Sequence, residues 1–368
     1  MRSPSRVALV ALLTTAGCRV EPADSDTVPG LADLSDADTL LSTLNADGEP
    51  VIFSPDDSVR RVLSVGESAL FPASLSPRGD RAAICTAAPG ESAGSPRDTV
   101  LEGELAMGLG KLDVARALCG DTIYGPNGDL VAWGEQDEDG MMRLRVTPVG
   151  DGLRPAGDDK VRARGLFAPN FVLGGSAVAA ITSTSTDVGP IGLADLGTGE
   201  TWTLTSTEAQ SELVASPDGR RLVTPHGYSL ILIDVAKDSA TTIWSSLDES
   251  DGCSVSDVDR DPECFLAVTR PSFSPDSSRV VFMARPQFGD YTPDLRVVDV
   301  YGGSETVFTD RSHYRDSPVF GSDGLVYWVD DFTAIGRAAP KAGAGDDAEL
   351  LPFGSASGLR VAWPKREE

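Results

Sequence analysis

The residues best suited to acid–base chemistry are the two histidines of the chain, His226 and His313. His226 lies in the segment Pro225–Tyr228, and His313 is followed directly by Tyr314 and Arg315. The sequence contains no H-E-x-x-H motif of a zinc peptidase and no phosphate-binding Gly-rich loop before a helix. An enzyme built from this sequence would therefore need His, Arg and Tyr side chains that converge in the fold.

Three carboxylates at alternate positions, Asp257, Asp259 and Asp261, resemble the start of a calcium-binding loop. However, Pro262 stands where such a loop has glycine, and no glutamate follows at the twelfth position. The segment is either a calcium site or a solvated acidic loop, and the two departures favour the acidic loop. Calcium is the one cofactor that the sequence raises.

The chain has five cysteines, and if Cys18 carries a lipid four remain. Their spacings match no zinc-binding framework. An even number of cysteines in an exported chain favours disulfides. Cys253 and Cys264 bracket ten residues around the acidic segment, so we expect a disulfide that closes this loop. Cys85 and Cys119 would form the second pair.

The elements that position these residues are short strands. Pro271–Asp310 reads as a four-stranded antiparallel unit, whose strands we name A to D in chain order. Its first turn is Ser274-Pro275-Asp276, in which proline presets one dihedral angle and Ser and Asp bond their own backbone. Catalysis by these turn residues is not expected, because turn geometry accounts for them.

Equivalent A–B turns recur at intervals of about 43 to 58 residues, the size of a propeller blade. They lie at residues 76–80, 125–129, 173–176, 216–220, 274–276 and 321–324. Each is followed by an apolar B strand: Ala82–Cys85, Leu130–Trp133, Ala177–Ile181, Leu222–Thr224, Val280–Met283 and Leu325–Val329.

The two ends of the repeat region complete each other. Gly358–Trp363 repeats the form of a B strand, with Leu350–Phe353 as its A strand. Pro50–Phe53 and Arg60–Val65 form a hairpin around Ser54-Pro55-Asp56, which fits strands C and D. We therefore expect both termini to share one blade and to close the ring, which removes unpaired sheet edges.

The S-P-D-G turn followed by an apolar strand, clearest at Ser216–Gly219 and Ser274–Asp276, is similar to the repeat of TolB-type β-propellers over residues 48–364. TolB has six blades and an additional α/β domain, for which this sequence leaves no room. The prediction is an all-β chain with a single seven-bladed propeller, and six blades are the alternative.

Strand direction places the A–B and C–D turns on one face of a propeller and the B–C and D–A connections on the other. The second set is long and varied in this sequence, which is typical of a binding surface. The candidate binding residues on that face are His226, Tyr228, Phe288, Tyr291, His313, Tyr314 and Arg315. The alternative is that they plug the channel mouth or pack the loops against each other.

Residues 1–17 resemble a bacterial lipoprotein signal peptide: Arg2 and Arg6 precede the apolar segment Val7–Leu13, and small residues lead to Cys18. The family prefers leucine three residues before the cysteine, where this chain has Thr15. An ordinary secretory signal with an incidental Cys18 is the alternative. The resemblance implies lipidation of Cys18 with palmitate, and residues 18–47 would then form a flexible tether.

The chain carries 56 acidic and 31 basic residues, a net charge of −25 at pH 7. Such a surface repels nucleic acid and anionic lipid, so neither is an expected partner. The sequence predicts a monomeric, exported lipoprotein of the bacterial cell envelope that binds a protein or envelope component without catalysis. The competing hypothesis is a propeller lyase or hydrolase that acts on a saccharide or peptide at the channel mouth.

Overall fold

The computed structural model divides the chain into residues 1–30 and residues 31–368. All residues that the structure describes belong to the second unit. They are residues 37–56, 60–63, 69, 72–86, 99–105, 110–111, 122–136, 142–149, 160–164, 166–182, 188–210, 212–246, 266–286, 292–302, 305–307, 313–341, 348–353 and 356–363.

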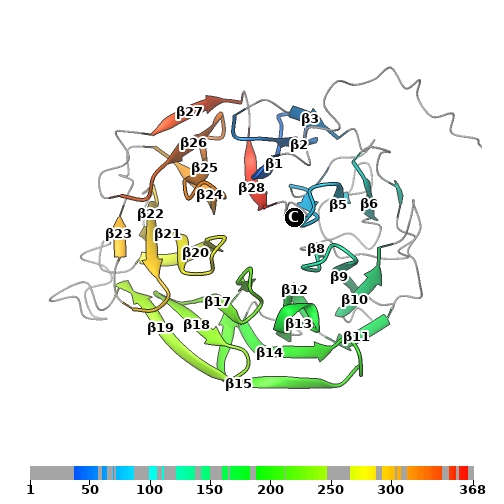
Figure 1. Ribbon diagram of the computed structural model, residues 1–368. Coiled ribbons are helices and arrows are strands. Elements are labelled where there is room, and N and C mark those ends of the chain that lie inside the picture. The colour runs from blue at the N-terminus through cyan, green and yellow to red at the C-terminus, as the bar shows by residue number, and fades with distance from the viewer. Residues whose placement is uncertain are drawn as a thin grey trace, which may run out of the picture. The chain divides into compact units, whose positions relative to one another are not determined.

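These residues form seven four-stranded antiparallel sheets that stand around a common centre (Figure 1). From the inner strand A outward to strand D, the sheets are β4 (Ser74–Leu75), β5 (Arg81–Thr86), β6 (Thr99–Glu104), β7 (Gly110–Lys111); β8 (Ile123–Tyr124), β9 (Leu130–Gln136), β10 (Met142–Pro148), β11 (Lys160–Arg164); β12 (Leu166–Val172), β13 (Ala177–Thr182), β14 (Val188–Asp195), β15 (Thr201–Gln210); β16 (Val214–Ala215), β17 (Arg221–His226), β18 (Ser229–Asp234), β19 (Ser239–Ser245); β20 (Leu266–Phe273), β21 (Arg279–Pro286), β22 (Asp294–Asp299), β23 (Glu305–Val307); β24 (Arg315–Phe320), β25 (Val326–Asp330), β26 (Ala334–Ala338), β27 (Glu349–Pro352); and β28 (Ser357–Ala362), β1 (Leu40–Leu44), β2 (Pro50–Phe53), β3 (Arg60–Val62). One 3-10 turn, η2 (Leu173–Gly175), joins β12 to β13. The expectation of an all-β propeller is confirmed. Each of the six B strands predicted after an A–B turn lies within an observed B strand or within one residue of it.

The B strands carry the core, because they are covered by neighbouring sheets on both faces. Every residue of β5 and of β25 is buried, whereas β15, a D strand, is largely exposed along its first half. The apolar clusters join one sheet to the next, as where Trp244 of β19 packs against Phe282 of β21 with ring centroids 5.0 Å apart. Burial on both faces explains why the B strands read as unbroken apolar runs in the sequence.

The A–B turns hold their shape through the hydrogen bonds that the Ser-Pro-Asp pattern predicts. Ser216 Oγ donates to Asp218 Oδ1 at 2.6 Å and accepts from the backbone N–H of Arg221 at 3.0 Å. Gly219 closes this turn with a φ of 67°, a left-handed conformation that favours glycine. The same bonds recur between Ser274, Asp276 and the N–H of Arg279, so the turn residues are used for turn geometry.

Neighbouring A–B turns are also bonded to each other around the ring. The N–H of Asp218 donates to Ser277 Oγ at 3.2 Å, and Arg221 Nη1 donates to the carbonyl oxygen of Ser277 at 3.2 Å. On the other side of the same turn, the N–H of Leu173 donates to the carbonyl oxygen of Gly219 at 2.7 Å. These bonds link three consecutive A–B turns to one another.

Three inner strands contain a bulge of two residues at the same place, and in each the second residue is proline. The register shifts lie at Ala168-Pro169 in β12, at Arg270-Pro271 in β20 and at Ser317-Pro318 in β24. Proline has no N–H to donate and is confined to edge strands and bulges. Since the inner strands are sheet edges that face the axis, these prolines block further strand pairing there.

Strands from both ends of the described chain share one sheet, but not in the predicted arrangement. β28 is the inner strand, pairing with β1, and β2 and β3 follow outward. Gly358–Trp363 therefore supplies an A strand rather than a B strand, and Leu350–Phe353 supplies the outer strand β27 of the preceding sheet. The turn at Ser54-Pro55-Asp56 does join strands C and D, as expected.

The predicted start of the propeller at residue 48 is too late, because Leu40–Leu44 already forms a fully buried B strand. Thr43 Oγ1 donates to the carbonyl oxygen of Gly358 at 2.7 Å, and Trp363 Nε1 donates to the carbonyl oxygen of Phe320 at 2.9 Å. The first bond lies within the shared sheet, and the second joins that sheet to the preceding one. No helix among the described residues is long and apolar enough to cross a membrane.

Candidate functional site

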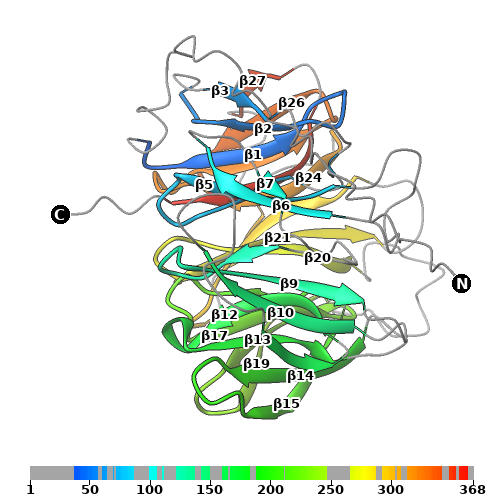
Figure 2. The ribbon, with the colours of Figure 1, turned by 90° about the vertical axis from the view of Figure 1, so that its right-hand side faces the viewer.

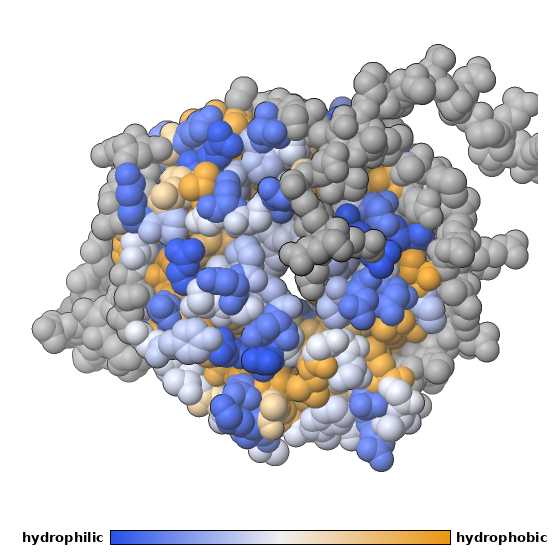
Figure 3. Space-filling model, in the orientation of Figure 1, coloured by the Kyte–Doolittle hydropathy of each residue, from blue (hydrophilic) through white to orange (hydrophobic). Residues whose placement is uncertain are grey.

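The two faces of the ring differ as the strand directions require. In Figure 2, β1, β9 and β21 run from left to right, so the A–B turns lie at the left and the B–C connections at the right. We call the face with the B–C and D–A connections the loop face and the opposite one the turn face. Figures 1 and 3 view the turn face.

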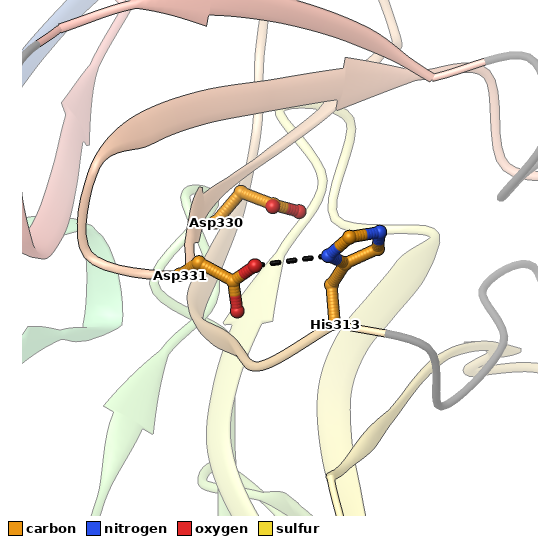
Figure 4. Close-up of side chains that lie close together, drawn as sticks. All are labelled: His313, Asp330 and Asp331. Carbon is orange, nitrogen blue, oxygen red and sulfur yellow. Dashed lines mark hydrogen bonds and ion pairs between the residues drawn. The ribbon is translucent and has the colours of Figure 1, made fainter.

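On the loop face, His313 meets the turn that joins β25 to β26. His313 Nδ1 lies 2.9 Å from Asp331 Oδ2, and one ligand atom each from His313, Asp330 and Asp331 lies within 4.8 Å of the others (Figure 4). His313 belongs to a D–A connection and Asp331 to a B–C turn, so the fold brings together two segments that strand direction assigns to one face. We call these three residues the His313 cluster.

The members of the His313 cluster differ in burial. His313 and Asp331 have side chains 56% and 47% exposed, whereas the Asp330 side chain is 8% exposed. Asp330 Oδ2 accepts from Trp328 Nε1 at 2.9 Å and lies 3.6 Å from Arg315 Nε. Asp330 is therefore a core residue whose charge is balanced by Arg315, and the exposed pair His313 and Asp331 is the part open to a ligand.

Arg315 does not belong to the exposed binding surface that the sequence suggested. Only 2% of the residue is exposed, and its guanidinium lies over the ring of Trp328. A buried charge needs a charge of opposite sign beside it, and Asp330 supplies that charge for Arg315. The prediction of Arg315 as an exposed binding residue is wrong.

Hydrogen bonds lower the pKa of Asp331. The largest cause is the hydrogen bond from His313, and the backbone N–H of Tyr314 also donates to Asp331 Oδ1, at 2.9 Å. Burial acts in the opposite direction and is the smaller effect. The carboxylate is thus held ionised, which also holds the histidine ring in place.

Two aromatic rings lie beside the cluster. Tyr314 and Phe332 stack with centroids 4.9 Å apart and an interplanar angle of 25°. Phe332 is 47% exposed, and its φ of 57° places it in the left-handed region, as does the φ of 45° at Asp331. The backbone N–H of Asp331 donates to the carbonyl oxygen of Tyr314 at 2.8 Å, so the turn and the connection are fixed to each other.

His226 and Tyr228 also lie on the loop face, at the sheet β16–β19, two sheets away from the His313 cluster around the ring. His226 ends β17 and is exposed, and Tyr228 is half-buried in the turn before β18. The intervening sheet β20–β23 separates them from the His313 cluster. The structure thus places both histidines on the predicted face without showing them in one site.

The remaining predicted site residues lie outside the described residues, with one exception. They are Cys18, Cys119, Cys253, Asp257, Asp259, Asp261, Cys264, Phe288 and Tyr291. Cys85 is buried in β5, and its pairing with Cys119 stays a prediction. The disulfide between Cys253 and Cys264 and the calcium loop also stay predictions.

The sequence Gly90–Gly94 has the G-x-S-x-G spacing of a hydrolase nucleophile elbow. It also lies outside the described residues, in the B–C connection between β5 and β6. A nucleophile elbow joins a strand to a helix, whereas this segment joins two antiparallel strands. The spacing therefore does not indicate a serine nucleophile at Ser92.

A cavity of about 460 Å³ lies on the axis of the ring, among the inner strands and the A–B turns. All seven sheets contribute to its lining, and none of the predicted loop-face residues does. Figure 3 shows a hollow near the centre of the turn face with hydrophilic side chains around it. Sequence reasoning missed this cavity because its wall is made of turn residues that their local geometry already explains.

No protein-family model and no curated protein matches the sequence. Among solved structures, an oligogalacturonate lyase in complex with manganese is similar, with a TM-score of 0.56, 15% identity and coverage of 81% of this chain and 84% of that chain. A putative 6-phosphogluconolactonase from Bacteroides fragilis has a TM-score of 0.51, 11% identity and coverage of 91% and 99%. TolB from Acinetobacter baumannii has a TM-score of 0.49, 15% identity and coverage of 94% and 88%. Likeness at these identities shows the fold alone: the chain is a β-propeller, and propellers of different functions are among its structural neighbours.

Proposed function

We propose that the chain is an exported lipoprotein whose propeller is a non-catalytic module that binds a protein or another component of the cell envelope through the loop face. The observation that carries this proposal is the stacked aromatic pair of exposed Phe332 and half-buried Tyr314 beside His313 and Asp331. Exposed aromatic rings on a rigid support are typical anchors of protein interfaces.

Rigidity of the pair supports binding rather than mere packing. The turn at Asp331 and Phe332 is joined to Tyr314 by two hydrogen bonds, and the N–H of Ala356 donates to the carbonyl oxygen of Phe332 at 2.9 Å. A surface that is ordered before binding loses little conformational entropy when a partner docks. Two non-glycine residues in the left-handed region also suggest that this turn is kept for a purpose other than stability.

The remaining parts of the proposal concern location and assembly. Each four-stranded sheet is one blade of a seven-bladed ring, and the ring is a monomer. Lipid on Cys18 and a tether up to the start of β1 hold the propeller at a membrane of a bacterial envelope. The similarity of the signal sequence and of the S-P-D-G repeat to exported lipoproteins and TolB-type propellers supports this placement.

An affinity pull-down from a native envelope fraction tests the proposed binding. We expect the wild type to retain a specific partner, and the double variant Tyr314→Ala and Phe332→Ala to lose it. Tyr301→Ala is the matched control, because Tyr301 is 74% exposed in a C–D turn on the turn face. Retention by the double variant, or equal loss in the control, would overturn the proposal.

The competing function is a propeller lyase or hydrolase for a saccharide or peptide. The observation that favours it is the pair of His313 and Asp331, since a carboxylate that orients an imidazole prepares it as a general base. Within the described residues, however, the cluster has no exposed arginine beside it, and Arg315 is buried. Cleavage of a polyuronate or peptide by the wild type, abolished in His313→Ala, would establish this function instead.

A further inference from the structure

The His313 cluster combines one imidazole with two carboxylates, which are common ligands of divalent metal ions in proteins. One ligand atom each from His313, Asp330 and Asp331 lies within 4.8 Å of the others. Figure 4 shows the three side chains pointing toward the space between them. They come from a D–A connection and a B–C turn, so the fold, rather than a local sequence motif, brings them together.

The spacing of these ligand atoms fits a zinc ion. Zinc lies about 2.0 to 2.2 Å from nitrogen and oxygen ligands, so two of its ligands are roughly 3 to 4.4 Å apart. The 2.9 Å between His313 Nδ1 and Asp331 Oδ2 is therefore the spacing of neighbouring ligands. The 4.8 Å limit exceeds the upper bound only slightly, and rotation of the exposed His313 and Asp331 side chains can close the difference.

Hydrogen bonds from the surrounding chain hold each carboxylate by one oxygen. Asp331 Oδ1 accepts from the N–H of Tyr314 at 2.9 Å, while Oδ2 of the same carboxylate lies beside His313. Asp330 Oδ2 accepts from Trp328 Nε1, also at 2.9 Å. Donors of this kind orient the ligands in metal sites and reduce the reorganisation that metal binding requires.

Asp330 brings a buried acceptor into the cluster. Its side chain is 8% exposed, and Trp328 and Arg315 both contact the same oxygen, Oδ2. Within the part of the chain that the structure describes, no hydrogen-bond donor contacts Asp330 Oδ1. Because a buried carboxylate oxygen needs a donor or a cation beside it, Oδ1 is the oxygen that a metal ion would use.

The charges of the cluster also suit a divalent cation. Asp330 and Asp331 carry two negative charges, and the buried Arg315 offsets the one on Asp330. The hydrogen bond from His313 is the largest cause that lowers the pKa of Asp331. This carboxylate is therefore ionised before a metal arrives, as a ligand must be. The net charge of −25 on the whole chain favours cations at its surface.

We propose that the His313 cluster binds one zinc ion, with His313, Asp330 and Asp331 as its protein ligands. Zinc takes the place of the proton between His313 Nδ1 and Asp331 Oδ2, and the neutral ring then carries its proton on Nε2. An imidazole ligand favours zinc over calcium and magnesium, which prefer oxygen ligands. His313 and Asp331 are 56% and 47% exposed, so water can occupy the solvent side of the ion.

Isothermal titration with zinc chloride of the full chain, freed of metal by a chelator, tests this proposal. We expect one zinc site whose affinity falls about tenfold or more in His313→Ala and in Asp331→Asn, since each variant removes a ligand. Calcium chloride should bind at this site about tenfold or more weakly than zinc. Both variants should keep the circular dichroism spectrum of the wild type, because the two side chains are half exposed.

His226→Ala is the matched control, because His226 is the other exposed histidine of the loop face and lies two sheets away. It should bind zinc as the wild type does. Three results would overturn the proposal: no zinc binding up to about 1 mM, unchanged zinc affinity in either cluster variant, or calcium binding as tightly as zinc at this site. The titration needs no partner, and the double variant of the pull-down keeps all three ligands. The zinc site and the proposed function can therefore fail independently.

Discussion

At the scale of single residues, the loop face is organised by Asp331. It accepts hydrogen bonds from His313 and from the N–H of Tyr314, and its own N–H donates back to Tyr314. One aspartate thus joins a B–C turn to a D–A connection. The stacked pair of Tyr314 and Phe332 depends on this junction, since the two residues follow His313 and Asp331 directly in their segments.

The free energy of unfolding should depend on pH in acid solution partly because of Asp331. Its pKa is lowered in the folded state, so its contribution is complete above the pKa of an unfolded aspartate, about 3.9, and is lost as the pH falls through the folded value. We expect the urea midpoint of the wild type to fall more steeply below about pH 4 than that of Asp331→Asn. Identical slopes for the two proteins would show that the junction contributes no stabilising charge.

The sequence predicted that both histidines lie on the loop face, but it did not predict that Arg315 is buried. His226 and His313 are exposed at B–C and D–A positions, as strand counting indicated. The sequence does not show that Arg315 is buried, because its partner Asp330 lies on the next strand and not in the D–A connection beside Arg315. A buried ion pair becomes visible only when the register between β24 and β25 is known, since Arg315 and Asp330 are directly paired there.

At the scale of elements, close contacts within a sheet restrict which residues can be exchanged. Gly336 of β26 lies beneath Trp328 of β25, and a Cβ atom at position 336 would lie 2.2 Å from the indole ring. Trp328 is fully buried and donates to Asp330, so it cannot move aside cheaply. The glycine is therefore required by packing across the strand pair rather than by its backbone angles.

We expect Gly336→Ala to lower the free energy of unfolding by about 1 to 3 kcal/mol, the usual cost of overpacking a core. Chemical denaturation monitored by circular dichroism measures this change. Gly197→Ala is the control, because Gly197 is in the turn after β14 and a Cβ atom there makes only ordinary contact with Asp195. A Gly336→Ala variant as stable as the wild type would mean that Trp328 can repack.

The positions of most B strands could be predicted from the sequence, whereas the order of the strands in the sheet shared by the two ends of the chain could not. The S-P-D-G turns and the apolar runs that follow them fix six of the B strands. The segment Leu40–Leu44 was missed because it is short and follows Asp- and Ser-rich sequence, which resembles a tether. Its role depends on β28, more than three hundred residues away, and local patterns carry no information about such a partner.

At the scale of the whole molecule, the ring depends on one strand from the C-terminal end. β28 supplies the inner strand of the sheet that it shares with β1, β2 and β3. Gly358 takes a φ of 65° in β28, and a Cβ atom there would meet Pro72 at 3.0 Å. The second feature shows that β28 packs closely against the segment that precedes β4.

Truncation before Gly358 should open the ring and expose the edge of β1 along with the apolar residues that it buries. We expect the truncated chain to aggregate, as measured by size-exclusion chromatography with light scattering, because an uncovered sheet edge invites pairing between chains. A truncated chain that stays monomeric and as stable as the wild type would contradict closure by β28.

The proposed attachment to a membrane depends on lipidation of Cys18 and has its own test. Cells supplied with radiolabelled palmitate should label the wild type and leave Cys18→Ala unlabelled. Equal labelling of the two proteins, or none in either, would contradict lipidation at this residue.

The central claim is that the loop face contacts a specific envelope component, and site-specific photocrosslinking tests it most directly. A photoreactive amino acid replaces Phe332 in one protein and Tyr301, on the turn face, in another. In intact cells we expect one discrete crosslinked species from position 332 and none from position 301. Absence of any product at 332, or the same products from both positions, would contradict the assignment of the loop face as the binding surface.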